Sequence, residues 1–301
     1  MTLGPSGTPV PSGRSAPAAA GDPLDPVDLD RYPVHEPGST AWTAAVRTAR
    51  SALAADGCAV LPGFVRPSRR DRLRAEGETV AADAHRETCT VNVYNTAPDP
   101  GLPADHPARV PLQRGNAFVA RDRIPAAHLV HRLYPDPGFR AFLAACTGAA
   151  ELHELADPLA GLCLNVVDPG RAHPWHFDTN EVAISLLTRA PEAGGEFEFC
   201  PDIRSAEAEN TADVADALAG RAPHRVRRLR LRAGDLQLFR GRYSLHRVTT
   251  VRGNTARHTA IFSYSARAGV IGSAERTRQL FGRVLPAHGG SRAVRVDGLM
   301  D

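Results

Sequence analysis

The sequence contains no lysine, so all 36 of its basic side chains are arginines, which stand against 33 acidic ones. The two kinds of charge are mixed along the chain, and the net charge of +3 is too small to predict a nucleic-acid or membrane partner. No apolar run approaches the ~18 residues that a membrane-spanning helix needs. Hydrophobic residues nevertheless make up 43% of the chain, which is enough for a packed core.

Cysteine is also scarce. The five cysteines are scattered, odd in number and never spaced as CxxC: Cys58, Cys89, Cys146, Cys163 and Cys200. A disulfide-rich secreted protein or a zinc site would be expected to carry paired or clustered cysteines. We therefore expect reduced thiols, packed as small apolar residues, in a cytoplasmic protein.

The first stretch, Met1 to Asp22, is rich in proline, glycine, serine and alanine, and it lacks the basic start and apolar run of a secretory signal. We expect a disordered tail over residues 1–30 and a single domain over residues 31–301. Within that domain we expect a helical or mixed first half over 31–155, a β-helix core over 156–270 and a C-terminal extension over 271–301.

Periodicity and turn residues predict where the elements lie. Helices are expected from Ser39 to Gly57, from Ser68 to His85, from Phe139 to Gly148 and from Thr211 to Gly220. Strands are expected at Cys58–Leu61, Thr88–Tyr94, Leu162–Val167, Val182–Thr188, Glu196–Cys200, Val226–Leu231, Leu236–Phe239, Arg247–Val251 and Arg257–Tyr264, with a hairpin turn at Arg252–Thr255. This order predicts a mainly β protein with flanking helices (α+β), built as a β-barrel or jelly roll.

The strongest chemical signal is His176 and Asp178, which lie two residues apart in an extended segment and so point the same way. His246, 70 residues later, supplies a third metal ligand. Two histidines and one carboxylate on one face of an octahedron leave three positions open, as iron(II) needs when it binds a bidentate cosubstrate and O2. A second histidine pair, His128 and His131, has no accompanying carboxylate and is interpreted as a solvated helix face.

Arg257 follows His246 by 11 residues, and Thr259 shares its face of the strand. A guanidinium beside a hydroxyl suits the far carboxylate of a 2-oxoacid that chelates iron by its other end. Arg252 is the rival, but its expected place in a turn makes it the poorer candidate. Asn165 either contacts the cosubstrate or is a plain buried amide. Ser263 shares the face of Arg257, and we expect Ser263 and Thr179 to contact the substrate.

His-x-Asp, a distal histidine and Arg-x-Thr, in this order, resemble the Fe(II)/2-oxoglutarate-dependent dioxygenase superfamily. The resemblance covers Gly161 to Tyr264 and extends upstream to Asp56–Phe64. It implies a double-stranded β-helix, which is a cupin-like jelly roll, with Fe(II), 2-oxoglutarate and O2 as cofactor and cosubstrates. The implied ligands are His176, Asp178 and His246.

A closer similarity links His173–His176, Gly194–Phe199 and Gly241–Val248 to the group that acts on free amino acids, which includes radical lysine halogenases and their hydroxylase relatives. The halogenases carry glycine where this chain has Asp178. The resemblance therefore implies oxygenation, or another radical outcome without a halide, rather than chlorination. It also implies that His173 and Arg114 hold the substrate carboxylate. Thr179 stands where the halogenases have an acidic contact, which argues against lysine as the substrate.

We expect an oxidoreductase of specialised metabolism that hydroxylates an unactivated C–H of a free amino acid or a similar small polar metabolite. The same radical chemistry leading to desaturation or ring closure, or acting on a carrier-tethered substrate, is an alternative. A cupin-like metal protein without O2 chemistry is less favoured because of Arg257 and Thr259. The partners expected are a small-molecule substrate and a second copy of the chain in a homodimer, without nucleic acid or membrane.

Overall fold

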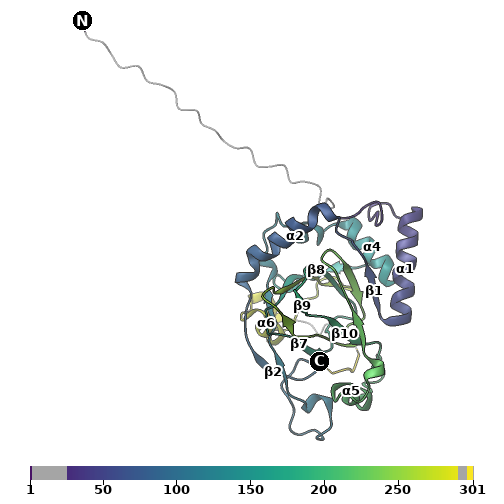
Figure 1. The fold of residues 1–301 in the computed structure, drawn as a ribbon, viewed down its shortest axis with the longest axis vertical. Helices are drawn as coiled ribbons and strands as arrows, with labels where there is room; N and C mark the ends of the chain where they lie inside the picture. The colour runs from purple at the N-terminus through teal and green to yellow at the C-terminus, as the bar shows by residue number, and fades with distance from the viewer. Residues whose placement is uncertain (2–25, 291–296, 301) are drawn as a thin grey trace.

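The computed structural model describes Met1, residues 26–290 and residues 297–300. Two antiparallel sheets form a jelly roll at the centre of these residues, and helices pack against it from outside (Figure 1). The predicted fold class, mainly β with flanking helices, is confirmed. No helix in the described part of the chain is both long and apolar enough to cross a membrane.

The larger sheet has six strands, and the smaller sheet has four. The larger one runs in the order β1 (Cys58–Leu61), β12 (Leu236–Phe239), β8 (Ala183–Arg189), β15 (Arg257–Phe262), β6 (Leu162–Val167) and β4 (Ala117–Val119). The smaller one runs β11 (Arg227–Leu229), β10 (Phe197–Cys200), β13 (Leu245–Val248) and β7 (His173–His176). Three short pairs flank them: β14 (Val251–Arg252) with β9 (Ala193–Gly194), β16 (Tyr264–Ser265) with β5 (His153–Glu154), and β2 (Cys89–Val91) with β3 (Leu112–Arg114).

In the sequence α1 precedes the first strand and α6 follows the last one, whereas α2 to α5 lie between strands. The α-helices are α1 (Thr40–Asp56), α2 (Pro67–Val80), α3 (Leu129–Leu133), α4 (Pro137–Thr147), α5 (Thr211–Leu218) and α6 (Ala274–Phe281). The 3-10 turns are η1 (Ala81–Asp83), η2 (Pro107–Arg109), η3 (Arg121–Arg123), η4 (Pro223–Arg225) and η5 (Pro286–Gly290). α1 begins as predicted, because the Ser39 side chain accepts from the amide of Trp42, and it ends at Gly57 in the left-handed conformation.

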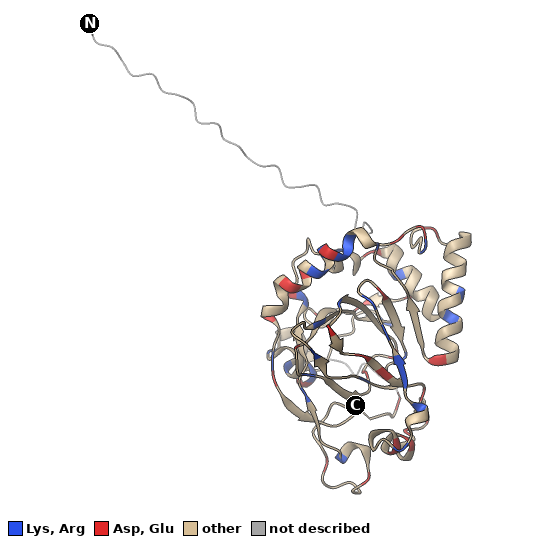
Figure 2. Ribbon diagram, in the orientation of Figure 1, with Lys and Arg blue, Asp and Glu red and all other residues tan. Residues whose placement is uncertain are grey.

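The helices of the first half cover the larger sheet, and α1 lies beside α4 (Figure 1). Their apolar faces and the outer face of the sheet share one core, in which Phe139 and Phe142 of α4 meet Phe262 of β15. α2 turns its charges outward, where blue and red alternate along it (Figure 2), and its arginines pair with acids one turn away. A second core beside α5 contains Trp175 and Phe177, as their alternation with the metal ligands predicts.

Several predicted boundaries are wrong. No hairpin forms at Arg252–Thr255, because β14 pairs with β9 while β15 pairs with β6 and β8. The chain crosses here between different sheets, and Glu192 accepts hydrogen bonds from the Asn254 amide and the Thr255 hydroxyl. The strand expected at Arg247–Val251 starts earlier, as β13, and so includes His246.

The first half also departs from expectation at two element ends. The strand expected at Thr88–Tyr94 is only Cys89–Val91, because the side chain of Asn92 accepts from the amides of Tyr94 and Thr96 and so closes a turn. The second helix ends at Val80 and continues only as the 3-10 turn η1.

The predicted tail is too long. Val27 is fully buried and forms a bridge with Val65, so residues 26–30 belong to the folded part. The rest of the predicted tail, residues 2–25, lies outside the described residues. The division into one domain with three regions stays a prediction.

Candidate metal centre and active site

The two histidines of the predicted triad lie on neighbouring strands of the smaller sheet. His246 of β13 is directly opposite His176 of β7. Nδ1 of His176 lies 2.8 Å from the Pro174 carbonyl oxygen, and Nδ1 of His246 lies 3.0 Å from that of Ser244. A backbone carbonyl can only accept, so each Nδ1 carries the proton and each Nε2 keeps a lone pair for a metal.

Asp178 follows β7 and completes the group. Its Oδ1 is 3.7 Å from Nε2 of His176, and its Oδ2 is 3.5 Å from Nε2 of His246. Two ligands bound to one ion at ~2.1 Å lie within ~4.2 Å of each other. The ligand atoms of the three side chains are therefore close enough together to bind one iron ion, as the predicted ligand set requires.

The electrostatics of the site favour metal binding. Burial, followed by the neighbouring His173 and His246, holds the pKa of His176 well below 6.5, so its imidazole is neutral. Burial alone would raise the pKa of Asp178, but His246, His176 and Arg276 lower it to about 2. Neutral imidazoles and an ionised carboxylate are the forms that bind a metal.

Gly241 makes room for the carboxylate, and sequence reasoning missed this role. Its carbonyl accepts from the Asp178 amide at 3.0 Å. A methyl group added at position 241 would overlap the Asp178 side chain. The glycine in Gly241-Arg242-Tyr243 is the sequence signal, but the sequence does not reveal which side chain approaches it.

Arg257 and Thr259 lie on β15 of the larger sheet, facing the cavity as predicted. Nη1 of Arg257 donates to Oγ1 of Thr259, and Arg257 is 5% exposed. Burial lowers the pKa of Arg257 to about 10, which still leaves it charged at neutral pH. Asn165 of β6 is directly opposite Thr259 and also lines the cavity, where its buried Oδ1 has no hydrogen-bond partner within the described structure.

The cavity between the two sheets has a volume of about 710 Å³. This is within the range of small-molecule sites, ~300–1,000 Å³. Its wall includes the whole triad, Arg257 with Thr259, and the predicted substrate contacts Thr179 and Ser263. These site residues, which are spread over the sequence from Asn165 to Ser263, therefore meet at one cavity.

His173 reaches this wall through an irregularity in β7. Residues three apart in a regular strand face opposite sides. Here His246 pairs with His176 but Val248 pairs with His173, so β7 has one extra residue at this point. The rings of His173 and His176 consequently stack with centroids 3.7 Å apart, and the buried Nε2 of His173 has no partner among the described atoms.

Arg114 of β3 does not line the cavity. It is 2% exposed and lies behind the wall, where its Nη2 donates to the carbonyl of Gln279 at 2.7 Å. Gln279 belongs to α6, which packs over the cavity. Six α6 residues that the predictions missed line the cavity: Glu275, Arg276, Thr277, Gln279, Leu280 and Phe281.

The rejected candidates lie elsewhere. Arg252 is exposed on β14. His131 contacts the Ile124 carbonyl, and His128 is the residue before α3, and neither lines the cavity.

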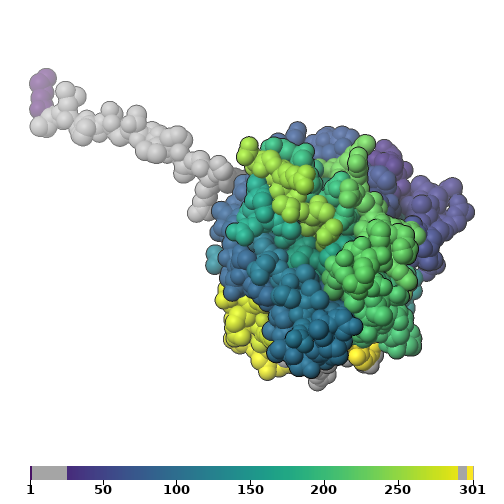
Figure 3. Space-filling model, turned by 60° about the horizontal axis from the view of Figure 1, so that its bottom comes forward, coloured from purple at the N-terminus to yellow at the C-terminus, as the bar shows by residue number. Residues whose placement is uncertain are grey.

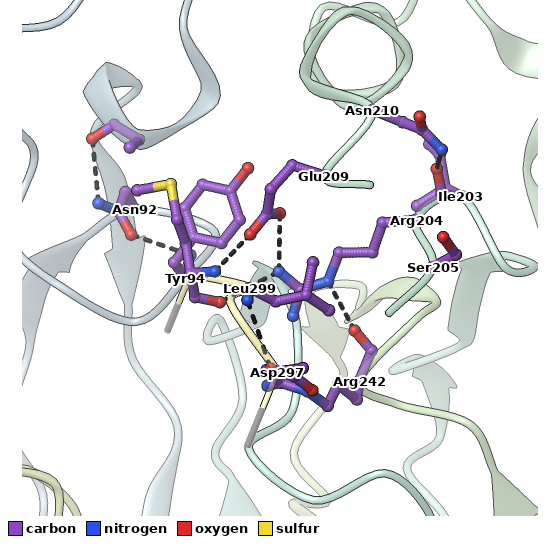
Figure 4. Close-up of polar contacts among 12 residues, drawn as sticks. Asn92, Tyr94, Ile203, Arg204, Ser205, Glu209, Asn210, Arg242, Asp297 and Leu299 are labelled. Atoms are coloured by element: carbon purple, nitrogen blue, oxygen red, sulfur yellow. Dashed lines mark hydrogen bonds and ion pairs between the residues drawn. The ribbon is translucent and has the colours of Figure 1, made fainter. Parts of the chain in front are cut away.

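Two buried arginines, Arg204 and Arg242, lie near Phe177, the residue between the metal ligands His176 and Asp178. Figure 4 shows the polar contacts of the two arginines. The guanidinium of Arg204 lies 3.8 Å from the ring centre of Phe177, and its Nε donates to the carbonyl of Arg242. Arg242 in turn forms an ion pair with Asp297, and Arg204 donates to the carbonyl of Met300. The segment 297–300 is thereby fixed against the same end of the jelly roll.

The loop after β2 lies next to the C-terminal elements. In Figure 3 the blue region around residue 100 lies next to the yellow C-terminal region. Nε2 of Gln279 donates to the carbonyl of Asn95 at 3.2 Å, so α6 and this loop are in contact. Tyr94, Asn95 and Thr96 line the cavity from the loop side.

The chain was compared with known proteins. The sequence model of the Halogenase D family matches residues 41–281, whereas no curated protein matches. Among solved structures, an oxidoreductase of the 2OG-Fe(II) oxygenase family from Burkholderia pseudomallei is 17% identical, with a TM-score of 0.46, covering 74% of this chain and 92% of that one. A prolyl hydroxylase from Trichoplax adhaerens, in complex with a hypoxia inducible factor peptide fragment, is 11% identical, with a TM-score of 0.49, covering 74% and 90%.

HygX from Streptomyces hygroscopicus, with nickel, 2-oxoglutarate and hygromycin B bound, is 15% identical, with a TM-score of 0.44, covering 71% of this chain and 84% of that one. These similarities to solved structures are distant, and they concern the fold alone. The family match covers most of the chain, and the His-Asp-His group at the cavity could hold a metal ion. The chain therefore belongs to the Halogenase D family, and it is an Fe(II)- and 2-oxoglutarate-dependent oxidoreductase.

Proposed function

We propose that this protein hydroxylates an unactivated C–H bond of a free amino acid or a similar small polar metabolite, with Fe(II), 2-oxoglutarate and O2. The observation that carries the proposal is Asp178, whose carboxylate lies within 3.7 Å of both histidine Nε2 atoms. A halide would need that coordination position, and here a protein carboxylate occupies it. Hydroxylation is thus favoured over chlorination in a chain of a halogenase family.

The protein residues have separate tasks in this reaction. Bound iron and 2-oxoglutarate supply the oxidant that removes a hydrogen atom from the substrate. His176, Asp178 and His246 hold iron on one side and leave the cavity side open. Arg257 and Thr259 bind the far carboxylate of 2-oxoglutarate, and Asn165 contacts the cosubstrate beside them.

The substrate contacts proposed are His173, Arg114, Thr179 and Ser263. Thr179 and Ser263 offer hydroxyls on the cavity wall, and His173 offers its unpartnered Nε2. Arg114 acts from behind the wall. Their shared task is to hold one C–H bond near the iron, since a radical reaction is directed by position.

Two further proposals concern the surroundings of the enzyme. The five cysteines are free thiols, four of them buried, which favours a reducing compartment such as the cytoplasm. A homodimer and a role in specialised metabolism remain predictions from the sequence.

The test is succinate release by purified, iron-loaded protein with a panel of free amino acids. His176→Ala and His246→Ala should abolish it, and mass analysis of the product separates hydroxylation from desaturation or ring closure. Wild-type turnover in either variant would contradict the ligand assignment. Asp178→Gly supplied with chloride probes the halogenase kinship, and a chlorinated product would support it. Turnover only with a carrier-tethered substrate would favour that alternative.

A further inference from the structure

Three arginines surround the cavity, but only Arg257 has a proposed anionic partner, the far carboxylate of 2-oxoglutarate. The other two, Arg114 of β3 and Arg276 of α6, meet at a single residue. Nη2 of Arg114 donates to the carbonyl of Gln279, and Nη1 of Arg276 donates to Oε1 of the same glutamine. Two guanidinium groups are thereby held close together at the α6 side of the cavity.

These two cations lack acidic partners. No ion pair joins either of them to a carboxylate within residues 26–290 and 297–300. Nε and Nη1 of Arg114 are buried without any hydrogen-bond partner in that same part of the chain. Arg114 is buried and Arg276 is partly buried. An unpaired buried charge is costly, and two like charges near each other repel, so this arrangement favours an anion between them.

The electrostatics agree with the geometry. Burial, followed by the charge of Arg114, lowers the pKa of Arg276 to about 10, and the charge of Asp178 opposes this. Arg276 lines the same cavity as Asp178, whereas Arg114 does not line it.

The acids on the cavity wall are engaged elsewhere. Asp178 is a proposed metal ligand, and Asp297 forms its ion pair with Arg242. Glu275 lines the cavity at its rim but is exposed to solvent. Among the described residues of the wall, a substrate that carries a cationic side chain would therefore find no free buried carboxylate, whereas an anionic group would find Arg276 with Arg114 behind it.

We propose that Arg276 is a specificity-determining residue that binds an anionic group of the substrate, with Arg114 supporting it, so that the substrate is a small organic acid of net negative charge, such as a dicarboxylic amino acid. The inference rests on the proposed function, because it names the substrate class of the same site. A site for a neutral amino acid binds one anionic group, the α-carboxylate, whereas the site proposed here binds a second anionic group as well. The α-carboxylate occupies the His173 side, and the second group occupies the Arg276 side.

The test compares acids with their neutral amides, which have nearly the same shape. Binding of L-glutamate, L-glutamine, L-aspartate, L-asparagine and L-lysine is measured by calorimetry under anaerobic conditions, with iron(II) and 2-oxoglutarate present so that no turnover occurs. In the wild-type chain one acid should bind at least roughly tenfold more tightly than its amide, as expected for a charge-assisted hydrogen bond.

Arg276→Gln should remove that preference, and Arg276→Lys should restore part of it. The matched control is Arg278→Gln, which removes an exposed arginine two residues further along α6 and should keep the preference. In all three variants the affinity for 2-oxoglutarate should equal that of the wild type, since Arg257 is intact.

The inference is overturned if no acid of the panel binds the wild-type chain, if an amide or L-lysine binds as well as the acids, or if Arg276→Gln retains the preference. These results are distinguishable from failure of the proposed function. Succinate release with a neutral or cationic substrate would support the proposed oxygenase activity and contradict the specificity for acids. If the protein never consumes 2-oxoglutarate but Arg276→Gln loses binding of the acid, the specificity is supported and the oxygenase activity is contradicted.

Discussion

Thr259 accepts a hydrogen bond from Nη1 of Arg257, two residues before it on β15. This hydrogen bond holds Nη1 of Arg257 in place, so the guanidinium is already oriented before a ligand binds. Preorganisation of this kind reduces the cost of ordering a side chain on binding.

Replacing Arg257 with glutamine should raise the KM for 2-oxoglutarate by roughly 10- to 100-fold, because a charge-assisted contact of ~1.5–3 kcal/mol is lost. Thr259→Val should raise it only a few-fold. Steady-state succinate release measures both. Arg252→Gln, which changes the exposed rival on β14, is the control, and an equal effect there would contradict the assignment of Arg257.

Removal of the metal should destabilise the fold. A ligand at 100 times its Kd adds ~2.7 kcal/mol to the free energy of unfolding. Chelator should therefore lower the Tm of the wild-type protein and leave His246→Ala unchanged, since that variant holds no iron. His224→Ala, at an exposed site, should respond like the wild type, and a chelator response in His246→Ala would argue against this ligand.

Gly241→Ala should weaken iron binding by at least roughly tenfold, because the added methyl group displaces the Asp178 carboxylate. Iron titration monitored by calorimetry is the measurement. Gly289→Ala, where a methyl group meets no other atom, should bind iron like the wild type. Equal affinity in both variants would show that the carboxylate does not depend on this space.

His258 should make the protein acid-sensitive. Burial, followed by the charge of Arg189, lowers its pKa from 6.5 to about 4. Between these values the unfolded chain binds a proton that the folded chain does not, so the free energy of unfolding falls as the pH falls from 6.5 towards 4. The loss from this one group is at most about 3 kcal/mol.

Urea unfolding at several pH values measures this effect, and His258→Gln should have a shallower pH dependence over the same range. The exposed variant His224→Gln should keep the wild-type slope. Identical slopes in wild type and His258→Gln would show that this imidazole is not responsible.

Thiol reagents should modify Cys89 first. Burial raises the pKa of Cys58, Cys146 and Cys163 to about 12, and that of Cys200 to about 11, so these thiols are protonated and shielded at neutral pH. Cys89 is only partly buried. Mass mapping after brief labelling at pH 8 checks the order, and Cys89→Ser should lose the fast phase.

Local patterns predicted much of this molecule. Leu162–Val167 and Leu236–Phe239 occur as strands with the predicted bounds, because apolar runs between turn residues specify buried strands well. The triad was predictable because His176 and Asp178 are two residues apart in an extended segment, so their side chains point the same way. The grouping with His246 is confirmed, whereas the substrate roles of His173, Arg114, Thr179 and Ser263 stay predictions.

What local pattern could not predict depends on long-range packing. The bulge that turns His173 into the cavity arises from pairing with β13, more than 70 positions away. Arg276 lies in a helix whose polar surface resembles any exposed helix, and only the docking of α6 over the cavity places it at the site. The sequence at Arg252–Thr255 suggests a hairpin because its turn residues predict a reversal of the chain. They do not show which strand the next one pairs with.

The ladder between β7 and β13 has a practical consequence for anyone preparing this protein. A one-residue slip in strand pairing turns every side chain of a strand to the opposite face. Such a slip would point His176 and His246 away from each other, so a misaligned chain could not retain iron however compact it became. After saturation with iron(II), the iron content of a purified sample therefore measures the fraction of molecules whose strands have paired in the correct alignment.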